Sequence, residues 1–287
     1  GILVNPTAIN ILELSNPNIL SIIEDETIMN TINTGIRGTS HTLLWAEPTY
    51  NYFIVEPNDT NGLLMNLYEN EPITQSASTL SLVGNQTDWG DGNIDENSTH
   101  TYTSGKYLIK TKLQIMNSTE YNNYWNNYNG NNSDYMEPAM PITKCMSIRK
   151  DIDNMDYFFA GPSIHLVHVC EIPDNITSMG GTFANCIEFN QTFNIPNNVT
   201  DISFILIHCN VFNKPLTIPN SVENMMFSFA ICYSFNQPLT IPNNVIDCMG
   251  LFYMCTSFNQ EVILPNKVIN IGEMLAGCTK FNQPLVI

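Results

Sequence analysis

The last third of the chain repeats itself every 23 residues, with no insertion between one copy and the next. The period is clearest in two columns of residues, five cysteines and five phenylalanines: Cys186, Cys209, Cys232, Cys255, Cys278, Phe189, Phe212, Phe235, Phe258 and Phe281. A constant period of this length is typical of a solenoid, in which each repeat forms one coil that stacks on its neighbours. One coil alone buries too little apolar surface to offset the entropy of ordering its backbone, so we expect the coils to fold only as a stack.

Each copy contains two local patterns. The Pro-Leu-x-Ile alternation, as in residues 215–218, predicts a short strand. The apolar residues that follow have spacings of 3, 4 and 3, as in Val222, Met225, Phe229 and Cys232. This spacing predicts a short helix or 3₁₀ turn on the other side of the coil. A strand on one side and a short helix on the other is leucine-rich-repeat geometry.

The repeat carries a distinctive motif, C-x-S-F-N-Q-P-L, which is complete at Cys232 and nearly complete at Cys255 and Cys278. With this motif, residues 170–287 resemble the BspA-type leucine-rich repeats of surface proteins. The resemblance implies a solenoid of five 23-residue repeats that acts as a protein-interaction and adhesion surface, and it brings no catalytic residues. Because the last repeat ends without a polar cap, we expect further repeats or a partner to cover it.

Two columns of the repeat have structural interpretations. An asparagine follows the phenylalanine in each copy, and we expect it to bond the backbone of adjacent coils as a ladder: Asn190, Asn213, Asn236, Asn259 and Asn282. The column cysteines point the same way from parallel strands, so we expect them to be free, buried thiols. Cys248 and Cys255 lie in different columns of one coil and are the pair most able to form an exception.

An upstream segment carries a second resemblance. Trp89-Gly90-Asp91-Gly92 is followed by His100-x-Tyr102 and by Gly105-x-Tyr107-x-Ile109. This order is similar to that of the PKD domain, an immunoglobulin-like β-sandwich that serves as a spacer or binding unit. The fold class expected for the chain is therefore mainly β with short helices, an N-terminal PKD-like β-sandwich followed by a leucine-rich-repeat solenoid.

The remaining boundaries follow from local composition. We expect residues 1–40 to form an extended arm or a partial β segment, 41–116 the PKD-like module, 117–143 an Asn/Tyr-rich linker, and 144–169 a cap for the solenoid at 170–287. The linker's aromatic residues form a contact surface or simply pack on neighbouring strands: Tyr121, Tyr124, Trp125, Tyr128 and Tyr135.

Two groups of residues have donors suited to metals. Asp88, Asp91, Asp95 and Glu96 surround a glycine turn and are weak calcium candidates, because they lack the ligand spacing of a calcium loop. A hydrogen-bonded turn is the competing interpretation. Zinc is weighed for a second group, with satisfied histidines in a cap as the favoured alternative: Cys145, His165, His168 and Cys170.

Composition narrows the function classes. The formal net charge of −17 argues against binding nucleic acid or anionic membrane surfaces, and no apolar run is long enough to span a membrane. No motif for a catalytic or cofactor site is present, so we expect no enzyme and no cofactor. Eight Asn-x-Ser/Thr sequons occur, of which Asn190 belongs to the Phe-Asn pair of the repeat and Asn198 is another. The remaining six are the glycosylation candidates: Asn58, Asn85, Asn97, Asn117, Asn131 and Asn175.

Together these features favour a non-enzymatic interaction or adhesion protein that is extracellular or on a cell or virion surface. Its partners would be proteins (a host surface, matrix or neighbouring subunits) or a glycan. The alternative is a structural component of a large assembly, such as a giant-virus capsid or a surface layer, that docks through the solenoid and the N-terminal arm as a homo- or hetero-oligomer.

Overall fold

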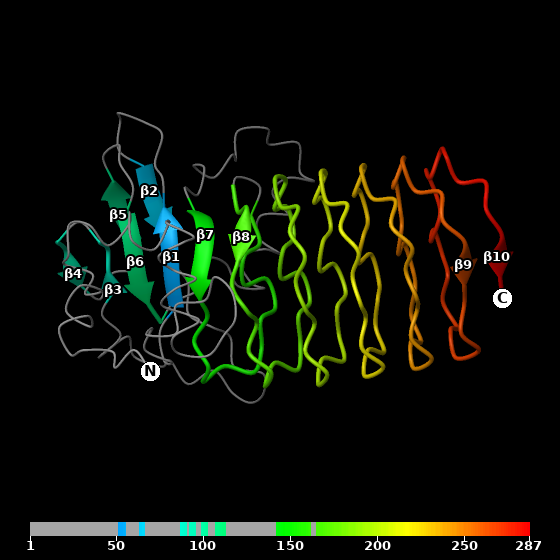
Figure 1. Ribbon diagram of the computed structural model, residues 1–287, viewed down its shortest axis with the longest axis horizontal. Coiled ribbons are helices and arrows are strands. Elements are labelled where there is room, and N and C mark those ends of the chain that lie inside the picture. The colour runs from blue at the N-terminus through cyan, green and yellow to red at the C-terminus, as the bar shows by residue number, and fades with distance from the viewer. Residues whose placement is uncertain are drawn as a thin grey trace, which may run out of the picture.

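The computed structural model describes residues 51–55, 63–66, 87–90, 92–95, 99–102, 107–112, 142–161 and 165–287. Figure 1 shows an elongated molecule in which short strands lie at one end and stacked coils extend from β7 to β10. The expected arm at 1–40 and most of the expected linker at 117–143 lie outside the described residues.

Among the ten strands within the described residues, six form one sheet, in the order β4-β3-β6-β1-β7-β8. Its members are β1 (Asn51–Val55), β3 (Thr87–Asp88), β4 (Ile94–Asp95), β6 (Tyr107–Thr111), β7 (Ile142–Ser147) and β8 (His168–Val169). The other four strands form two pairs, β2 (Leu63–Asn66) with β5 (Thr99–Tyr102) and β9 (Val262–Ile263) with β10 (Leu285–Val286).

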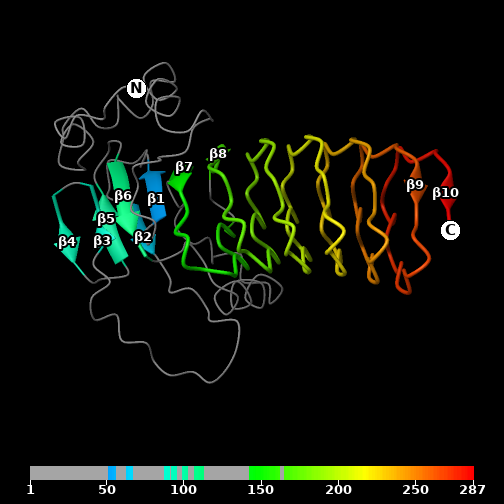
Figure 2. The same cartoon turned by 60° about the horizontal axis from the view of Figure 1, so that its bottom comes forward.

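The N-terminal strands and the solenoid share this sheet. β1 pairs antiparallel with both β6 and β7, whereas β7 pairs parallel with β8, the strand of the following coil. Figure 2 shows β1 next to β7 at the end of the stack. The expected cap at 144–169 is described at 144–161 and 165–169, and these residues stack on the next coil, since Asn154 begins the row of parallel bridges that continues through Ser178 and Asp201.

The side of each coil opposite the strands is a string of β-turns. Alternate backbone N–H groups donate to the next coil, for example Gly181 to the Ser203 carbonyl (2.7 Å) and Phe183 to the Ile205 carbonyl (2.9 Å). The N–H groups between them donate locally, as Ala184 does to the Gly181 carbonyl (2.9 Å). On the turn side, each coil is therefore joined to the next by backbone hydrogen bonds, as in a leucine-rich-repeat-like solenoid. On the opposite side the described strand pairs between coils are β7 with β8 and β9 with β10.

The prediction of a short helix or 3₁₀ turn on the turn side is wrong, because none of the described residues is helical. The physical reason is that each coil has residues with positive φ, two of them in every coil from Gly181 onward, and these prevent a helix from propagating. These positions form two columns down the stack: Tyr157, Gly181, Phe204, Phe227, Gly250 and Glu273 in one, and Asn185, His208, Ile231, Met254 and Gly277 in the other.

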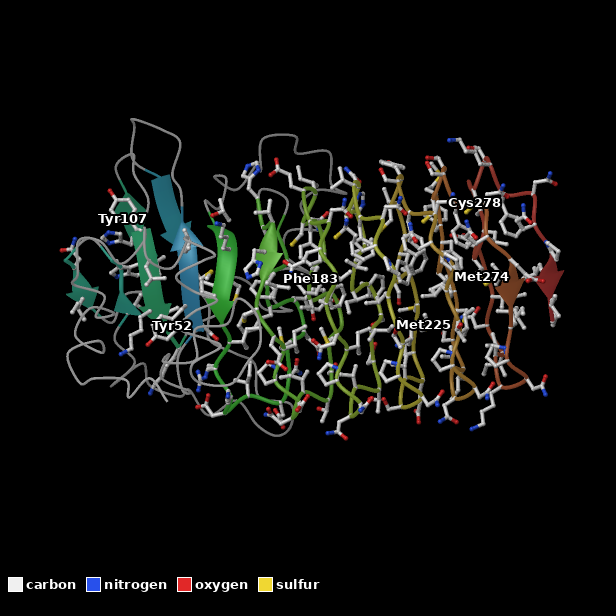
Figure 3. The ribbon with its side chains drawn as sticks, in the orientation of Figure 1. Tyr52, Tyr107, Phe183, Met225, Met274 and Cys278 are labelled. Carbon is white, nitrogen blue, oxygen red and sulfur yellow. The ribbon has the colours of Figure 1, made fainter. Side chains whose placement is uncertain are left out.

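One apolar core runs from the N-terminal sheet through the coils, and Figure 3 shows its side chains filling the space between the two sides of the stack. The column phenylalanines stack with ring centroids 6.0–6.1 Å apart and planes within 14° of parallel: Phe189, Phe212, Phe235, Phe258 and Phe281. At the other end, the ring centroid of Phe53 in β1 lies 6.4 Å from the ring centroids of both Phe158 and Phe159 in the first coil. The β1 strand therefore covers the end of the solenoid core.

Candidate interaction surface

The strand side of the solenoid presents at least two exposed residues in each coil, such as Pro215 and Thr217. These residues alternate with buried ones, so that Thr217 is exposed between the buried Leu216 and Ile218. We call the column of exposed positions the strand face: Asn194, Thr217, Thr240, Ile263 and Val286. These positions are 23 residues apart, so each occupies the same place in its coil, and Ile263 and Val286 belong to β9 and β10.

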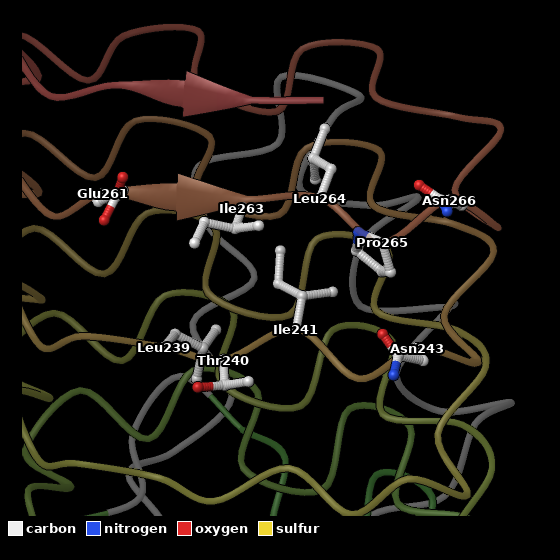
Figure 4. Close-up of a pocket in the computed structure, with 9 residues that line it drawn as sticks. All are labelled: Leu239, Thr240, Ile241, Asn243, Glu261, Ile263, Leu264, Pro265 and Asn266. Carbon is white, nitrogen blue, oxygen red and sulfur yellow. The ribbon is translucent and has the colours of Figure 1, made fainter.

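A hollow of about 400 Å³ lies on this side between two successive coils. Figure 4 shows that the hollow is lined by Leu239, Thr240 and Ile241 of one coil and by Ile263, Leu264 and Pro265 of the next. Asn243 and Asn266 lie at one end, and Glu261 is the charged residue of the lining. The surface is therefore mostly uncharged, with apolar, amide and hydroxyl groups available for contact.

The asparagine ladder predicted from the sequence is confirmed. The Asn190 side-chain oxygen accepts the backbone N–H of Asn213 (3.0 Å), and the same bond recurs from Asn213 to Asn236 (2.9 Å) and from Asn236 to Asn259 (2.8 Å). Asn259 accepts from Asn282 in the same way (2.8 Å). The ladder fixes the corner that precedes each strand segment, so the strand face is held by bonds between coils.

The cysteine column has a role that the sequence did not reveal. Each thiol donates to a backbone carbonyl of the preceding coil, for example Cys209 Sγ to the Phe183 oxygen (3.0 Å) and Cys232 Sγ to the Leu206 oxygen (3.0 Å). The Phe183 oxygen also accepts the Cys186 N–H (3.0 Å), so the Cys209 thiol binds the second lone pair of that oxygen. Cysteine is small enough for the core and still supplies a donor, which alanine lacks.

Burial determines the chemistry of these thiols. Loss of solvent raises the pKa of Cys209 and Cys232 well above the ordinary thiol value. Burial also raises the pKa of Cys278 to about 11. The column thiols are therefore protonated at neutral pH and are poor nucleophiles. Cys248 and Cys255, the pair weighed as an exception, are both free thiols, and Cys255 Sγ donates to the Phe229 oxygen (2.8 Å).

A column of alternating aspartate and asparagine lines the turn side. Asp201, Asn224, Asp247 and Asn270 occupy the row of parallel bridges, and each accepts the N–H of the residue two positions later. The Asn224 amide also donates to Asp201 Oδ2 (3.2 Å), and the Asn270 amide to Asp247 Oδ2 (3.1 Å). Because amides separate the carboxylates, no two negative charges are adjacent within this row.

The metal candidates are only partly described. Asp91 and Glu96 lie outside the described residues, and the structure describes only the backbone of Asp88 and Asp95, in the paired strands β3 and β4. Within the described ranges, no group of three or more His, Cys, Asp or Glu residues is arranged to hold a metal ion. Of the zinc candidates, His165 Nδ1 lies 2.9 Å from Glu188 Oε1, and the Cys145 and Cys170 sulfurs lie 3.9 Å apart.

The remaining candidates are placed as follows. The Asn175 amide is exposed and donates to the Lys150 and Ile152 carbonyls, so a glycan there would replace a hydrogen that the fold uses. The other five glycosylation candidates and the linker aromatics fall outside the described residues: Asn58, Asn85, Asn97, Asn117, Asn131, Tyr121, Tyr124, Trp125, Tyr128 and Tyr135. In the part of the chain that the structure describes, no helix has the length and apolarity to cross a membrane.

Comparisons with known proteins concern the repeats. A family model described as "Mycoplasma protein of unknown function, DUF285" matches residues 150–241 and 177–286. No curated protein matches the chain in sequence. Among solved structures, the chain is similar to a leucine-rich repeat protein from Bacteroides ovatus ATCC 8483, with 21% identity and a TM-score of 0.42. That similarity covers 50% of this chain and 37% of the other protein.

Proposed function

We propose that this protein is a non-enzymatic interaction or adhesion protein of an extracellular, cell or virion surface. Its leucine-rich-repeat-like solenoid acts as a rigid scaffold, and the strand face binds a partner protein or a glycan. The supporting observation is the row of exposed residues from Asn194 to Val286 beside a mostly uncharged hollow. Flat rows of this kind suit partners with extended surfaces, because each coil contributes one contact.

The N-terminal strands belong to the same proposal as a PKD-like module that serves as a spacer or second binding unit. Trp89 of the W-G-D-G turn is fully buried, and its ring stacks on that of His100 with centroids 4.8 Å apart. Its backbone N–H donates to the backbone carbonyl of Asn93 (3.1 Å). A buried tryptophan at the turn between β3 and β4 supports a folded module with its own packed side chains, in place of an exposed loop.

The test is solid-phase binding of the full chain to purified fibronectin, laminin and collagen and to a glycan array. We expect saturable binding to at least one probe, and we expect Thr240→Arg to weaken it about tenfold or more, because the added charge lies in the strand face. The matched control is Thr200→Arg, since Thr200 is exposed beyond the Pro196–Val199 corner and off the strand face. Equal binding by the Thr240→Arg variant and the unsubstituted chain would contradict a role for the strand face.

A structural subunit of a large assembly is the second candidate. It is favoured by two exposed apolar residues on adjacent coils, Val211 and Tyr233, each 42% exposed. Such residues suit edge-on packing of one solenoid against another subunit. Light scattering of the full chain separates the two candidates, because the assembly function predicts oligomers that Tyr233→Arg disrupts. A monomer at all concentrations would count against self-assembly.

A further inference from the structure

Three cysteines lie outside the five-member column, Cys145, Cys170 and Cys248, and the first two lie close together. Cys145 belongs to β7 in the first coil, and Cys170 follows β8 in the next. Both side chains are buried, at 0% and 6% exposure, and their sulfur atoms are 3.9 Å apart. The two residues are 25 positions apart, whereas the column cysteines recur every 23.

This difference in spacing explains why the two thiols approach each other. The strand register pairs Cys145 with Val169, so Cys170 lies one residue further along the neighbouring strand. The Cys170 N–H donates to the Cys145 carbonyl (3.0 Å), which holds the two backbones together. Cys170 lies just past the end of β8, so it is not bound to the alternation of that strand, and its sulfur lies 3.9 Å from that of Cys145. Each column thiol is instead directed at a carbonyl of the preceding coil.

The geometry needs little change for a covalent bond. A disulfide joins sulfur atoms at about 2.0 Å and requires backbones that are already close, as neighbouring strands are. The remaining approach of the two sulfur atoms lies within the range of small side-chain rotations. Cys145 lies in β7 and Cys170 directly follows β8, which pairs with β7, so the two backbones are already neighbours.

We propose that Cys145 and Cys170 form a disulfide when the protein folds in the presence of a disulfide oxidant such as oxidised glutathione. One cysteine, as its thiolate, attacks the glutathione disulfide and releases one glutathione thiolate, leaving a mixed disulfide. The second thiolate then attacks the protein sulfur of that mixed disulfide and releases the second glutathione. The two thiol protons pass to the two glutathione molecules, so the protein is oxidised by two electrons and the oxidant is reduced.

The bond ties together the strands at the junction of the molecule. β7 pairs with β1 on one side and with β8 on the other, so a link from β7 to β8 fastens the coil to which the N-terminal sheet is attached. Closing the loop between the two cysteines restricts the unfolded chain and stabilises the folded one.

Peptide mapping tests the pairing directly. The full chain is refolded with a glutathione redox buffer, alkylated without reduction, and digested with trypsin and a glutamate-specific protease. This digestion places Cys145 on the peptide of residues 145–149 and Cys170 on the separate peptide of residues 151–171. We expect these two peptides joined by a disulfide and the other six cysteines alkylated. The proposal is overturned if both peptides are recovered separately in alkylated form, or if another pairing predominates.

Thermal unfolding provides the second readout. We expect reduction to lower the Tm of the oxidised wild-type chain by roughly 5 °C. Cys145→Ser should remove this sensitivity to reductant, and the control Cys209→Ser should keep it, because Cys209 is outside the pair. A wild-type Tm that is the same with and without reductant would contradict a stabilising bond, and the peptide map decides the pairing even if a variant fails to fold.

Discussion

At the scale of single residues, each coil carries polar groups whose partners lie one coil away. The column thiols, the ladder asparagines and the Asp/Asn row all bond across coils, and Figure 3 shows the side chains arranged in repeated rows. Stability therefore depends on neighbours in space that are about one repeat apart in sequence. The loss of folding stability caused by a substitution should therefore depend on which hydrogen-bond partner the substitution leaves without a bond.

Removal of the Asn236 side chain should be costly. Its oxygen accepts the Asn259 N–H (2.8 Å) and the Gln260 amide (3.1 Å), so Asn236→Ala leaves both donors without this acceptor. We expect a loss of about 1–3 kcal/mol in the free energy of unfolding, measured by urea denaturation. Asn282→Ala is the matched control, because this exposed asparagine ends the ladder in the chain described. A similar loss in both variants would count against the ladder as the cause.

The thiol of Cys278 should make stability depend on alkaline pH. Burial raises its pKa from 9.0 to about 11, so the folded state keeps the proton that the unfolded state releases first. The resulting stabilisation is complete below pH 9 and is lost as the pH rises through about 11. Cys278→Ala should unfold with a smaller change in Tm between pH 9 and pH 11 than the unsubstituted chain. An identical change in the two proteins would refute the assignment.

At the scale of elements, the stacking and the alternation of buried residues follow from the sequence, but the turn side does not. The strand predicted at 215–218 is wrong as well, since these residues have no regular secondary structure. The alternation of Leu216, Thr217 and Ile218 correctly predicted which residues are buried. The spacing of Val222, Met225 and Phe229 fits a helix and a string of β-turns equally well. The deciding feature is positive φ, and the residues that adopt it include Phe, His and Ile, which give no turn signal.

The glycines in the positive-φ columns give a test of this arrangement. A Cβ on Gly250, whose φ is 59°, would overlap the ring of Phe227 in the preceding coil. We expect Gly250→Ala to lower the free energy of unfolding by about 2 kcal/mol or more, from the backbone cost and the displaced ring together. Gly272→Ala is the control, because the nearest atom to its added Cβ is 3.5 Å away and its φ is not positive. Calorimetry showing equal Tm values for both variants would be inconsistent with the packing described.

The N-terminal sheet shows a second limit of the sequence. The pairing of β1 with both β6 and β7 joins residues far apart in the chain, and no local pattern specifies such a partner. The resemblance of the W-G-D-G segment to a PKD domain suggested strands there, but not that β1 would continue the sheet into the solenoid. The candidate site was likewise only partly predictable, since the exposed row followed from alternation and the hollow beside Ile263 did not.

At the scale of the whole molecule, the protein is a rod whose coils share one core and one hydrogen-bond network. Phe53 and Trp89 belong to the same buried cluster as the column phenylalanines, so the N-terminal strands and the coils are packed as a unit. A rod of this kind presents its strand face along the full length of the stack, which is the property that the proposed interaction function needs (Figure 1).

The arrangement of coils is tested most directly by through-hydrogen-bond couplings in nuclear magnetic resonance, which identify the acceptor of each backbone N–H. The Phe227 nitrogen should couple to the carbonyl carbon of Met249, because its N–H donates to that oxygen across coils (2.8 Å). In a helix the same N–H would donate to Glu223, four residues earlier. A coupling to Met249 is the predicted result, and a coupling to Glu223 would contradict the stacked-coil account.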